Sequence, residues 1–371
     1  MAQEAKCPAA PGRVPEYEWL RLIATVFVVV GHSAYWAINT AHGGVYYGAD
    51  EFVWIAPAYF SAVFGGVRAV AGWVYRFHMA AFFFLSGAVL RLRPMGAPGR
   101  FLAKKARRLL VPYYLCGLVW MLPVKYLAAF YTAEELPAAL GNFLLGGSDA
   151  GHLWFLWALF WCMAVFALLE KLLAIDAKKW WFCCVPLALG AALHLLSQRL
   201  PVWFALQQFA AYFIWFALGW AFEPLRAAAA ARPCRGRVLL LAGGFALVSA
   251  GWIAADRYGL LGGRSSMLVG CIWCWLLAAL CTKMFEKCSR SRLFAVVSRQ
   301  LFCVYLLHDP LEHLLLRLFM ENHLLAAGAG CWAYLLARTV GVFAFCVAAG
   351  ELHRLLQQRK KEKTQKKEIT I

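Results

Sequence analysis

The stretch WLRLIATVFVVVGHSAYW, residues 19–36, decides the fold class, because it is mostly apolar yet carries an arginine near its start and a histidine towards its end. A run of about 20 apolar residues is long enough to cross the ~30 Å hydrocarbon core of a bilayer as a helix. Similar runs recur along the whole chain, which is 63% hydrophobic and 15% charged. Soluble domains carry about 25% charged residues. The sequence therefore predicts an all-α integral membrane protein.

We predict a polytopic bundle of about ten transmembrane helices in one domain, residues 19–350. A segment of residues 1–18 precedes it, and the basic tail QQRKKEKTQKKEIT within residues 351–371 follows it. Charged runs of this kind are typically disordered. The expected spans are 19–38, 72–90, 109–129, 152–170, 180–197, 203–222, 238–255, 266–284, 300–319 and 331–350.

Basic residues outnumber acidic ones by 37 to 19. In a soluble chain this excess would suggest nucleic acid, but here the lysines and arginines gather in alternate connections between the predicted spans. Cytoplasmic connections of membrane proteins carry such an excess. The charge therefore indicates topology, with both termini in the cytoplasm, and gives no support for nucleic acid as a partner. Two longer segments on the other side, residues 39–71 and 131–151, are either linkers or acceptor-binding surfaces.

Arg21 and His32 are the two ionisable side chains of the opening stretch. Eleven residues of helix rotate by about 1100°, close to three full turns, so both side chains share one face, roughly 16 Å apart along the axis. They are too far apart for a salt bridge. The arginine could hold phosphate oxygens at the cytoplasmic boundary, and the histidine could exchange a proton near mid-membrane. Alternatively, Arg21 anchors the helix at the interface and His32 makes a hydrogen bond between helices.

The motif of an arginine, ten residues and a histidine in LRLIATVFVVVGHS resembles the opening motif of the acyltransferase-3 family of integral membrane acyltransferases. Four further stretches resemble family signatures in the same order, over roughly residues 17–350 of the chain. They are FHMAAFFFLSGAVL with His78 and Ser86, the basic segment FLAKKARRLLVPYY, GHLWFLWALF with His152 and Trp154, and SRQLFCVYLLHDPL with His308.

The resemblance implies an acyl-CoA co-substrate from the cytoplasm and an essential histidine on the first span. Arg21 and His32 would then be the catalytic residues, with Arg21 and the basic segment holding the coenzyme A phosphates. In that segment the candidates are Lys104, Lys105, Arg107 and Arg108. Many relatives have arginines spaced three apart here, and the lysines lack the bidentate guanidinium. These four residues could equally be topology anchors.

The resemblance also implies a hydroxyl acceptor, such as a saccharide or a cell-wall polymer, often presented from the other side of a bacterial cytoplasmic membrane. The acyl group could instead pass to a separate extracytoplasmic protein. His32 would take the proton of the acceptor hydroxyl or carry the acyl group itself. His78, Ser86, His152, Trp154 and His308 would support the site or bind the acceptor, or else stabilise the helix bundle. We expect no permanently bound cofactor and no metal.

Two other functional classes use the same residues. A transporter or exporter would use intramembrane arginine and histidine as a substrate or proton path. The sequence has no internal repeat of the kind that many transporters have. A sensory or scaffold membrane protein would account for the spans but not for five ordered motifs. We therefore predict a membrane O-acyltransferase, with a transporter as the main alternative.

Overall fold

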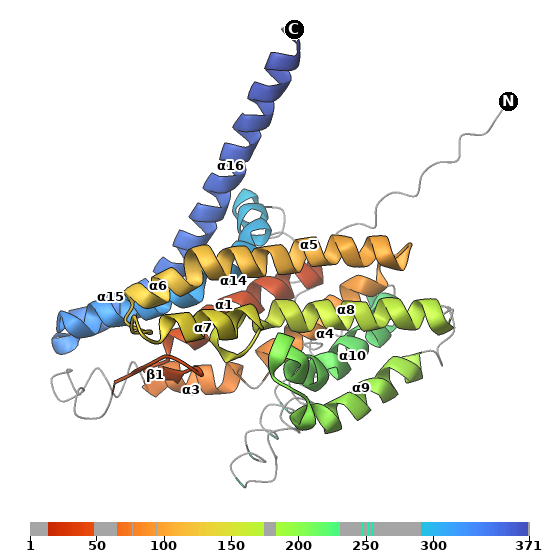
Figure 1. The fold of residues 1–371 in the computed structure, drawn as a ribbon, viewed down its shortest axis with the longest axis horizontal. Helices are drawn as coiled ribbons and strands as arrows, with labels where there is room; N and C mark the ends of the chain where they lie inside the picture. The colour runs from red at the N-terminus through yellow and green to blue at the C-terminus, as the bar shows by residue number, and fades with distance from the viewer. Residues whose placement is uncertain are drawn as a thin grey trace.

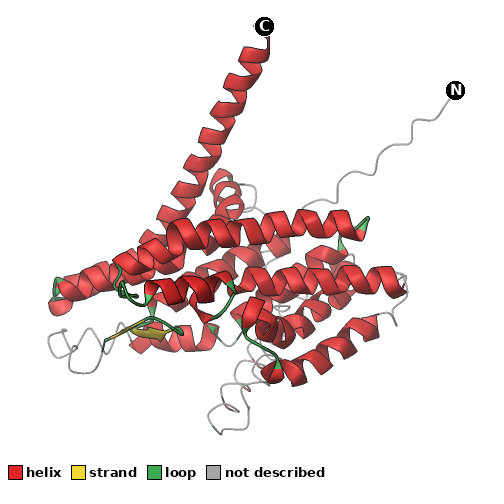
Figure 2. Ribbon diagram, in the orientation of Figure 1, coloured by secondary structure: helices red, strands yellow, loops and turns green. Residues whose placement is uncertain are grey.

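A computed structural model describes residues 14–47, 65–75, 77–93, 95–173, 183–230 and 291–369, with isolated positions between 247 and 258. Within these residues almost all regular structure is helical, and one short hairpin supplies the strands (Figure 2). The predicted spans 238–255 and 266–284 lie outside the described residues, apart from those isolated positions.

The first helix, α1 (Pro15–Ser33), ends before the predicted limit of residue 38. Strands β1 (Ala37–Asn39) and β2 (Gly44–Tyr46) follow and pair antiparallel, with Ala37 opposite Tyr46. Gly43 in the turn between them and Gly44 at the start of β2 are both sites where an added Cβ would collide with neighbouring atoms. The last two residues of the predicted first span therefore begin the hairpin and do not continue α1.

Two other predicted spans differ in their limits. The span 72–90 is interrupted, because α3 (Gly65–Val74) and α4 (His78–Arg91) are separate helices. The span 109–129 begins much earlier, since α5 (Pro98–Cys116) continues through a π-helical turn, Gly117–Met121, into α6 (Leu122–Leu127). The basic segment thus lies on a helix, not in a loop. Proline near the N-terminus and helix-favouring lysine and arginine explain this extension.

The remaining helices form the rest of the bundle (Figure 1). They cover most of the predicted spans 152–170, 180–197, 203–222, 300–319 and 331–350. Their bounds are α7 (Leu136–Leu144), the 3-10 turn η4 (Ser148–Leu153), α8 (Trp154–Leu173), α9 (Cys184–Leu196), α10 (Leu206–Ala230), α14 (Arg292–Glu321), α15 (Gly328–Leu336), the π-helical turn Ala337–Gly341 and α16 (Val342–Ile369).

The prediction of a disordered tail is wrong. Helix α16 runs on through the charged residues to Ile369 and protrudes from the bundle (Figure 1). Lysine, arginine, glutamine and glutamate, which make up most of the tail, all favour helix. An ion pair between Glu351 and Arg354, three residues apart, adds a small stabilisation of the helix where it leaves the bundle.

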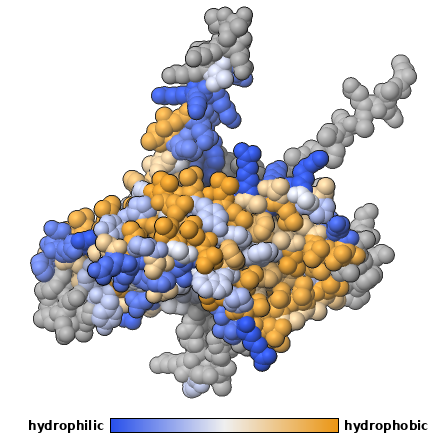
Figure 3. All heavy atoms as spheres, in the orientation of Figure 1, coloured by the Kyte–Doolittle hydropathy of each residue, from blue (hydrophilic) through white to orange (hydrophobic). Residues whose placement is uncertain are grey.

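The surface of the bundle is suited to lipid. Within the described part of the chain, five helical segments are long and apolar enough to cross a membrane: Gly65–Arg91, Pro98–Leu127, Ser148–Leu172, Trp203–Pro224 and Gly328–Glu362. Hydrophobic side chains cover much of the visible face of the bundle, whereas the protruding part of α16 is mainly hydrophilic (Figure 3). The chain is therefore an almost entirely helical multi-pass membrane protein. The described residues do not confirm the predicted number of ten spans.

Helices α4 and α10 pack closely against each other through glycine. A Cβ at Gly87 would collide with the carbonyl oxygen of Phe216, and a Cβ at Gly219 with the carbonyl oxygen of Phe84. Small residues allow helix backbones to approach in this way within membranes. The Ser-Gly of the second motif therefore has a packing role at its glycine.

We expect Gly219→Ala to lower the free energy of unfolding by about 1–3 kcal/mol, because the added methyl group forces α4 and α10 apart. Gly72→Ala on α3 is the matched control, since a Cβ there meets no described atom within 4 Å. It should change stability by less than about 1 kcal/mol. Denaturant unfolding of both variants in detergent measures the difference, and equal stabilities would contradict the packing argument.

Candidate functional site

A buried carboxylate, Asp309 on α14, is the centre of the candidate site. Its Oδ1 lies 2.8 Å from His32 Nδ1, and its Oδ2 lies 2.9 Å from Lys125 Nζ and 3.2 Å from His152 Nδ1. His313 Nε2, one turn further along α14, is 3.6 Å from Oδ1. We call these five residues the Asp309 cluster. It joins the end of α1, the helix α6, the turn η4 and the middle of α14.

His32 is the most accessible member of the Asp309 cluster. Its side chain is 12% exposed, compared with 4% or less for the other members. Because the carboxylate accepts hydrogen bonds, His32 donates from Nδ1, and Nε2 is left as the acceptor. A histidine oriented by a carboxylate in this way is the usual arrangement of a general base.

His308 adds a second imidazole beside His32. The two ring centroids are 4.8 Å apart, and the His152 ring is 5.1 Å from that of His308. His308 donates from Nδ1 to the carbonyl oxygens of Val304 and Tyr305 on its own helix, at 3.0 and 2.9 Å. Its Nε2 is buried and has no hydrogen-bond partner among the described residues. Such atoms are rare in folded proteins, so this nitrogen is suited to bind a proton donor.

Gly151 allows the turn η4 to approach the Asp309 cluster. Its backbone has φ of 52°, in the left-handed region, and a Cβ there would lie 3.0 Å from Lys125 Nζ. Glycine adopts this conformation without strain. The turn can therefore place His152 against Asp309, where His152 also donates from Nε2 to the carbonyl oxygen of Leu306 at 3.2 Å.

A buried ion pair fixes the end of α1. Arg338 Nε, in the second π-helical turn, lies 2.7 Å from Glu312 Oε2, and both side chains are almost fully buried. The same guanidinium donates to the Tyr334 hydroxyl and to the carbonyl oxygens of His32 and Tyr35, at 3.1 and 3.4 Å for the carbonyls. Arg338 therefore satisfies carbonyl groups at the C-terminus of α1 and holds the backbone of His32.

The other predicted supporting residues lie outside the Asp309 cluster. His78, at the start of α4, donates to the carbonyl oxygen of Val74 at 3.0 Å, and its ring packs against Tyr75. The Ser86 hydroxyl donates to the carbonyl oxygen of Phe82 on its own helix. Trp154 packs in an aromatic group with Tyr212 and Phe83. The structure thus brings together His32, His152 and His308, but not His78, Ser86 or Trp154.

The predicted phosphate-binding residues lie on the first parts of α1 and α5. Arg21 belongs to the same uninterrupted helix as His32 and is half-buried. Their separation of eleven positions corresponds to about 16 Å along the axis, as predicted. Lys104, Arg107 and Arg108 are exposed, and Lys105 lies over the Phe101 ring. This part of α5 is at the opposite end of the bundle from the hairpin (Figure 1).

Sequence reasoning did not select most of the ionisable residues at this site. The missed residues are Lys125, Asp309, Glu312, His313 and Arg338. All of them fall within the predicted apolar spans, where an ionisable side chain is a functional candidate by default. A search for ionisable residues within the apolar spans would have found them. The segment HDPLEH, residues 308–313, alone contains three of the five. Among the described residues, no group of histidine, cysteine, aspartate or glutamate is arranged to hold a metal ion.

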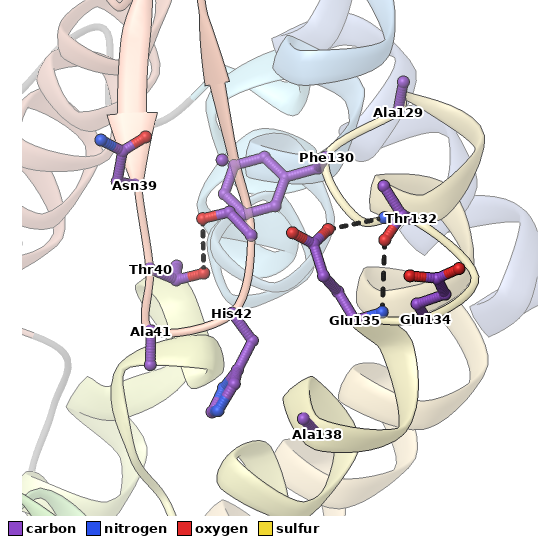
Figure 4. Close-up of a pocket in the computed structure, with 12 residues that line it drawn as sticks. Asn39, Thr40, Ala41, His42, Ala129, Phe130, Thr132, Glu134, Glu135 and Ala138 are labelled. Carbon is purple, nitrogen blue, oxygen red and sulfur yellow. Dashed lines mark hydrogen bonds between the residues drawn. The ribbon is translucent and has the colours of Figure 1, made fainter.

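An open groove of about 790 Å³ lies between the hairpin and the segment that leads into α7 (Figure 4). Residues 39–44 of the hairpin form one wall, and residues within 129–138 form the other. Phe130 lines the groove, and its ring also lies 4.6 Å from Lys125 Nζ and 5.0 Å from the His313 ring. Parts of the two longer segments between spans, 39–71 and 131–151, thus meet in one groove.

Comparison with known proteins supports the motif analysis. A family model described as an acyltransferase domain matches residues 14–351, nearly the whole chain. This is the acyltransferase-3 family that the five motifs resemble. Comparisons with curated proteins and with solved structures found no match.

We expect Arg338→Met to lower the free energy of unfolding by about 3–5 kcal/mol, because it leaves the Glu312 carboxylate buried without its partner. The double variant Arg338→Met, Glu312→Gln should recover more than half of this loss. Arg354→Met is the matched control, since the Arg354–Glu351 pair on α16 is partly exposed. It should change stability by less than about 1 kcal/mol.

The free energy of unfolding in detergent is measured for Arg338→Met, for the control variant and for the double variant. A double variant as unstable as Arg338→Met would contradict the coupling between Arg338 and Glu312.

Proposed function

This chain belongs to the acyltransferase-3 family, and we propose that it is an O-acyltransferase that uses acyl-CoA. In this proposal the chain moves an acyl group, acetyl in the simplest case, to a hydroxyl of a saccharide or another cell-envelope acceptor. The observation that carries the proposal is the contact between His32 and the buried Asp309 at 2.8 Å, with Lys125 on the same carboxylate.

His32 acts as the general base. Its Nε2 takes the proton of the acceptor hydroxyl while the hydroxyl oxygen attacks the carbonyl carbon of the thioester. The C–S bond then breaks, and the imidazolium gives this proton to the departing coenzyme A thiolate. Asp309 stabilises the imidazolium during the step. General bases of this kind typically contribute about 10²- to 10⁴-fold in rate.

The donor is bound along α1. Arg21 and the basic residues of α5 hold its phosphates through charge-assisted hydrogen bonds, and the thin pantetheine arm follows α1 towards His32. The basic residues are Lys104, Lys105, Arg107 and Arg108. The positive charge of this region suits a cytoplasmic donor. The chain would then lie in the cytoplasmic membrane of a bacterium with both termini in the cytoplasm.

The test is acetyl-CoA binding and slow thioester hydrolysis by the purified chain in nanodiscs. We expect Arg21→Ala to weaken binding about tenfold or more, because a guanidinium–phosphate contact is lost. His32→Ala should reduce hydrolysis at least ~100-fold while leaving binding nearly unchanged, because only the proton transfer is lost.

The matched control is Arg199→Ala, which removes an exposed arginine from the turn after α9. It should bind and hydrolyse acetyl-CoA as the wild type does. Equal hydrolysis by His32→Ala and the wild type would contradict the role of His32. A folded wild type that binds no acyl-CoA would contradict the proposed donor and favour a transporter.

A further inference from the structure

His42 and Asp149 form a second histidine–carboxylate pair, outside the Asp309 cluster. His42 Nδ1 lies 2.7 Å from Asp149 Oδ2, although the two residues are 107 positions apart in the sequence. The carboxylate is fully buried, whereas the histidine side chain is 36% exposed and lines the groove. We propose that this pair binds the acyl acceptor, and that the acceptor is a neutral or amino-bearing polyol, not an acidic one. The inference rests on the proposed acyltransferase function.

Asp149 is held in place by three contacts. Tyr131 donates its hydroxyl to Asp149 Oδ1 at 3.3 Å, and the backbone amide of Asp149 donates to Asn142 Oδ1 at 2.9 Å. Burial raises the pKa of Tyr131, so this hydroxyl keeps its proton and remains a donor. The third contact is His42 itself. A carboxylate fixed on both oxygens orients the imidazole that it binds.

The pair leaves one nitrogen of His42 for a ligand. Since Asp149 accepts from Nδ1, Nε2 is the acceptor atom of the ring. Nε2 makes no hydrogen bond to any residue in the described part of the chain. Figure 4 shows the His42 ring extending between the hairpin and α7, near Ala138. A hydroxyl group of a ligand in the groove can therefore donate to His42 Nε2.

The charge of the groove selects against anions. Glu134 and Glu135 line it, and none of the described residues that line it is a lysine or an arginine, although the chain as a whole has a net charge of +18. Glu135 accepts from the backbone amide of Thr132 at 2.8 Å, which lowers the pKa of its carboxyl and keeps it ionised. Carboxylates accept hydrogen bonds from sugar hydroxyls and repel negative charge. The groove therefore favours polyols that carry no acidic group.

Two elements connect the groove to the Asp309 cluster, the turn η4 and the residue Phe130. The turn η4 places Asp149 against His42 and, three residues later, His152 against Asp309. Phe130 lies between the groove and the Asp309 cluster and contacts both. Phe130 therefore connects the groove to Lys125 and His313 of the Asp309 cluster. His42 has a positioning role in this inference, whereas the proton transfer is assigned to His32.

The experiment measures transfer of radiolabelled acetyl from acetyl-CoA by the full chain in nanodiscs. The two probes are methyl glucoside and methyl glucuronide, which share one ring but differ in charge. We expect a lower KM for the glucoside. His42→Gln should raise this KM about five- to tenfold through loss of one hydrogen bond, with a much smaller change in kcat. His353→Gln, which changes an exposed histidine on α16, is the matched control.

Glu134→Lys provides a second test, because Glu134 is exposed and its replacement leaves the buried pair intact. It should shift the preference towards the glucuronide. An unchanged KM in His42→Gln, or an unchanged preference in Glu134→Lys, would overturn the inference. So would a wild type that hydrolyses acetyl-CoA but acetylates neither sugar, and that result leaves the proposed function intact. A folded wild type with neither hydrolysis nor transfer would overturn both.

Discussion

The interior of this bundle depends on one buried negative charge. A carboxylate removed from water is strongly unfavourable unless charged or hydrogen-bonding partners surround it. Asp309 obtains these partners from Lys125, His32 and His152, on three other segments of the chain. Each partner reaches Asp309 only if its segment ends or turns beside the carboxylate. The compensation of Asp309 therefore determines where α1 ends, why η4 contains a left-handed glycine and how α6 faces α14.

The second ion pair extends this arrangement to the backbone. Arg338 compensates Glu312 and simultaneously binds the carbonyl oxygens at the end of α1. Charges on α14 and in the turn before α16 thus position the imidazole that the family motif places on the first span. The turn η4 contributes to both sites. Its Asp149 contacts His42 at the groove, and its His152 contacts Asp309 in the interior. The two sites are joined through one short turn.

Composition and apolar runs were sufficient to predict an all-helical membrane protein, and ordered motifs were sufficient to predict its family. Both depend on local sequence. His32, His152 and His308 were selected because each belongs to a motif, and the structure places them together. Asp309 and Lys125 could have been selected as charges within apolar spans. The contact between His42 and Asp149 could not, because it joins two connecting segments whose approach depends on tertiary packing. Helix limits were missed where hydropathy continues but the backbone turns, as at Ser33.

The two π-helical turns give the bundle a rotational offset. Such a turn contains one residue more than a regular helical turn, so everything that follows is rotated by about 100°. Lys125 follows the turn Gly117–Met121, and Arg338 lies within the turn Ala337–Gly341. If the same residues of the first turn formed a regular α-helix, Lys125 would be rotated by about 100° away from Asp309. The register of α6 is therefore as constrained as the identity of its lysine, because without the π-helical turn the buried Asp309 would lose its ammonium partner.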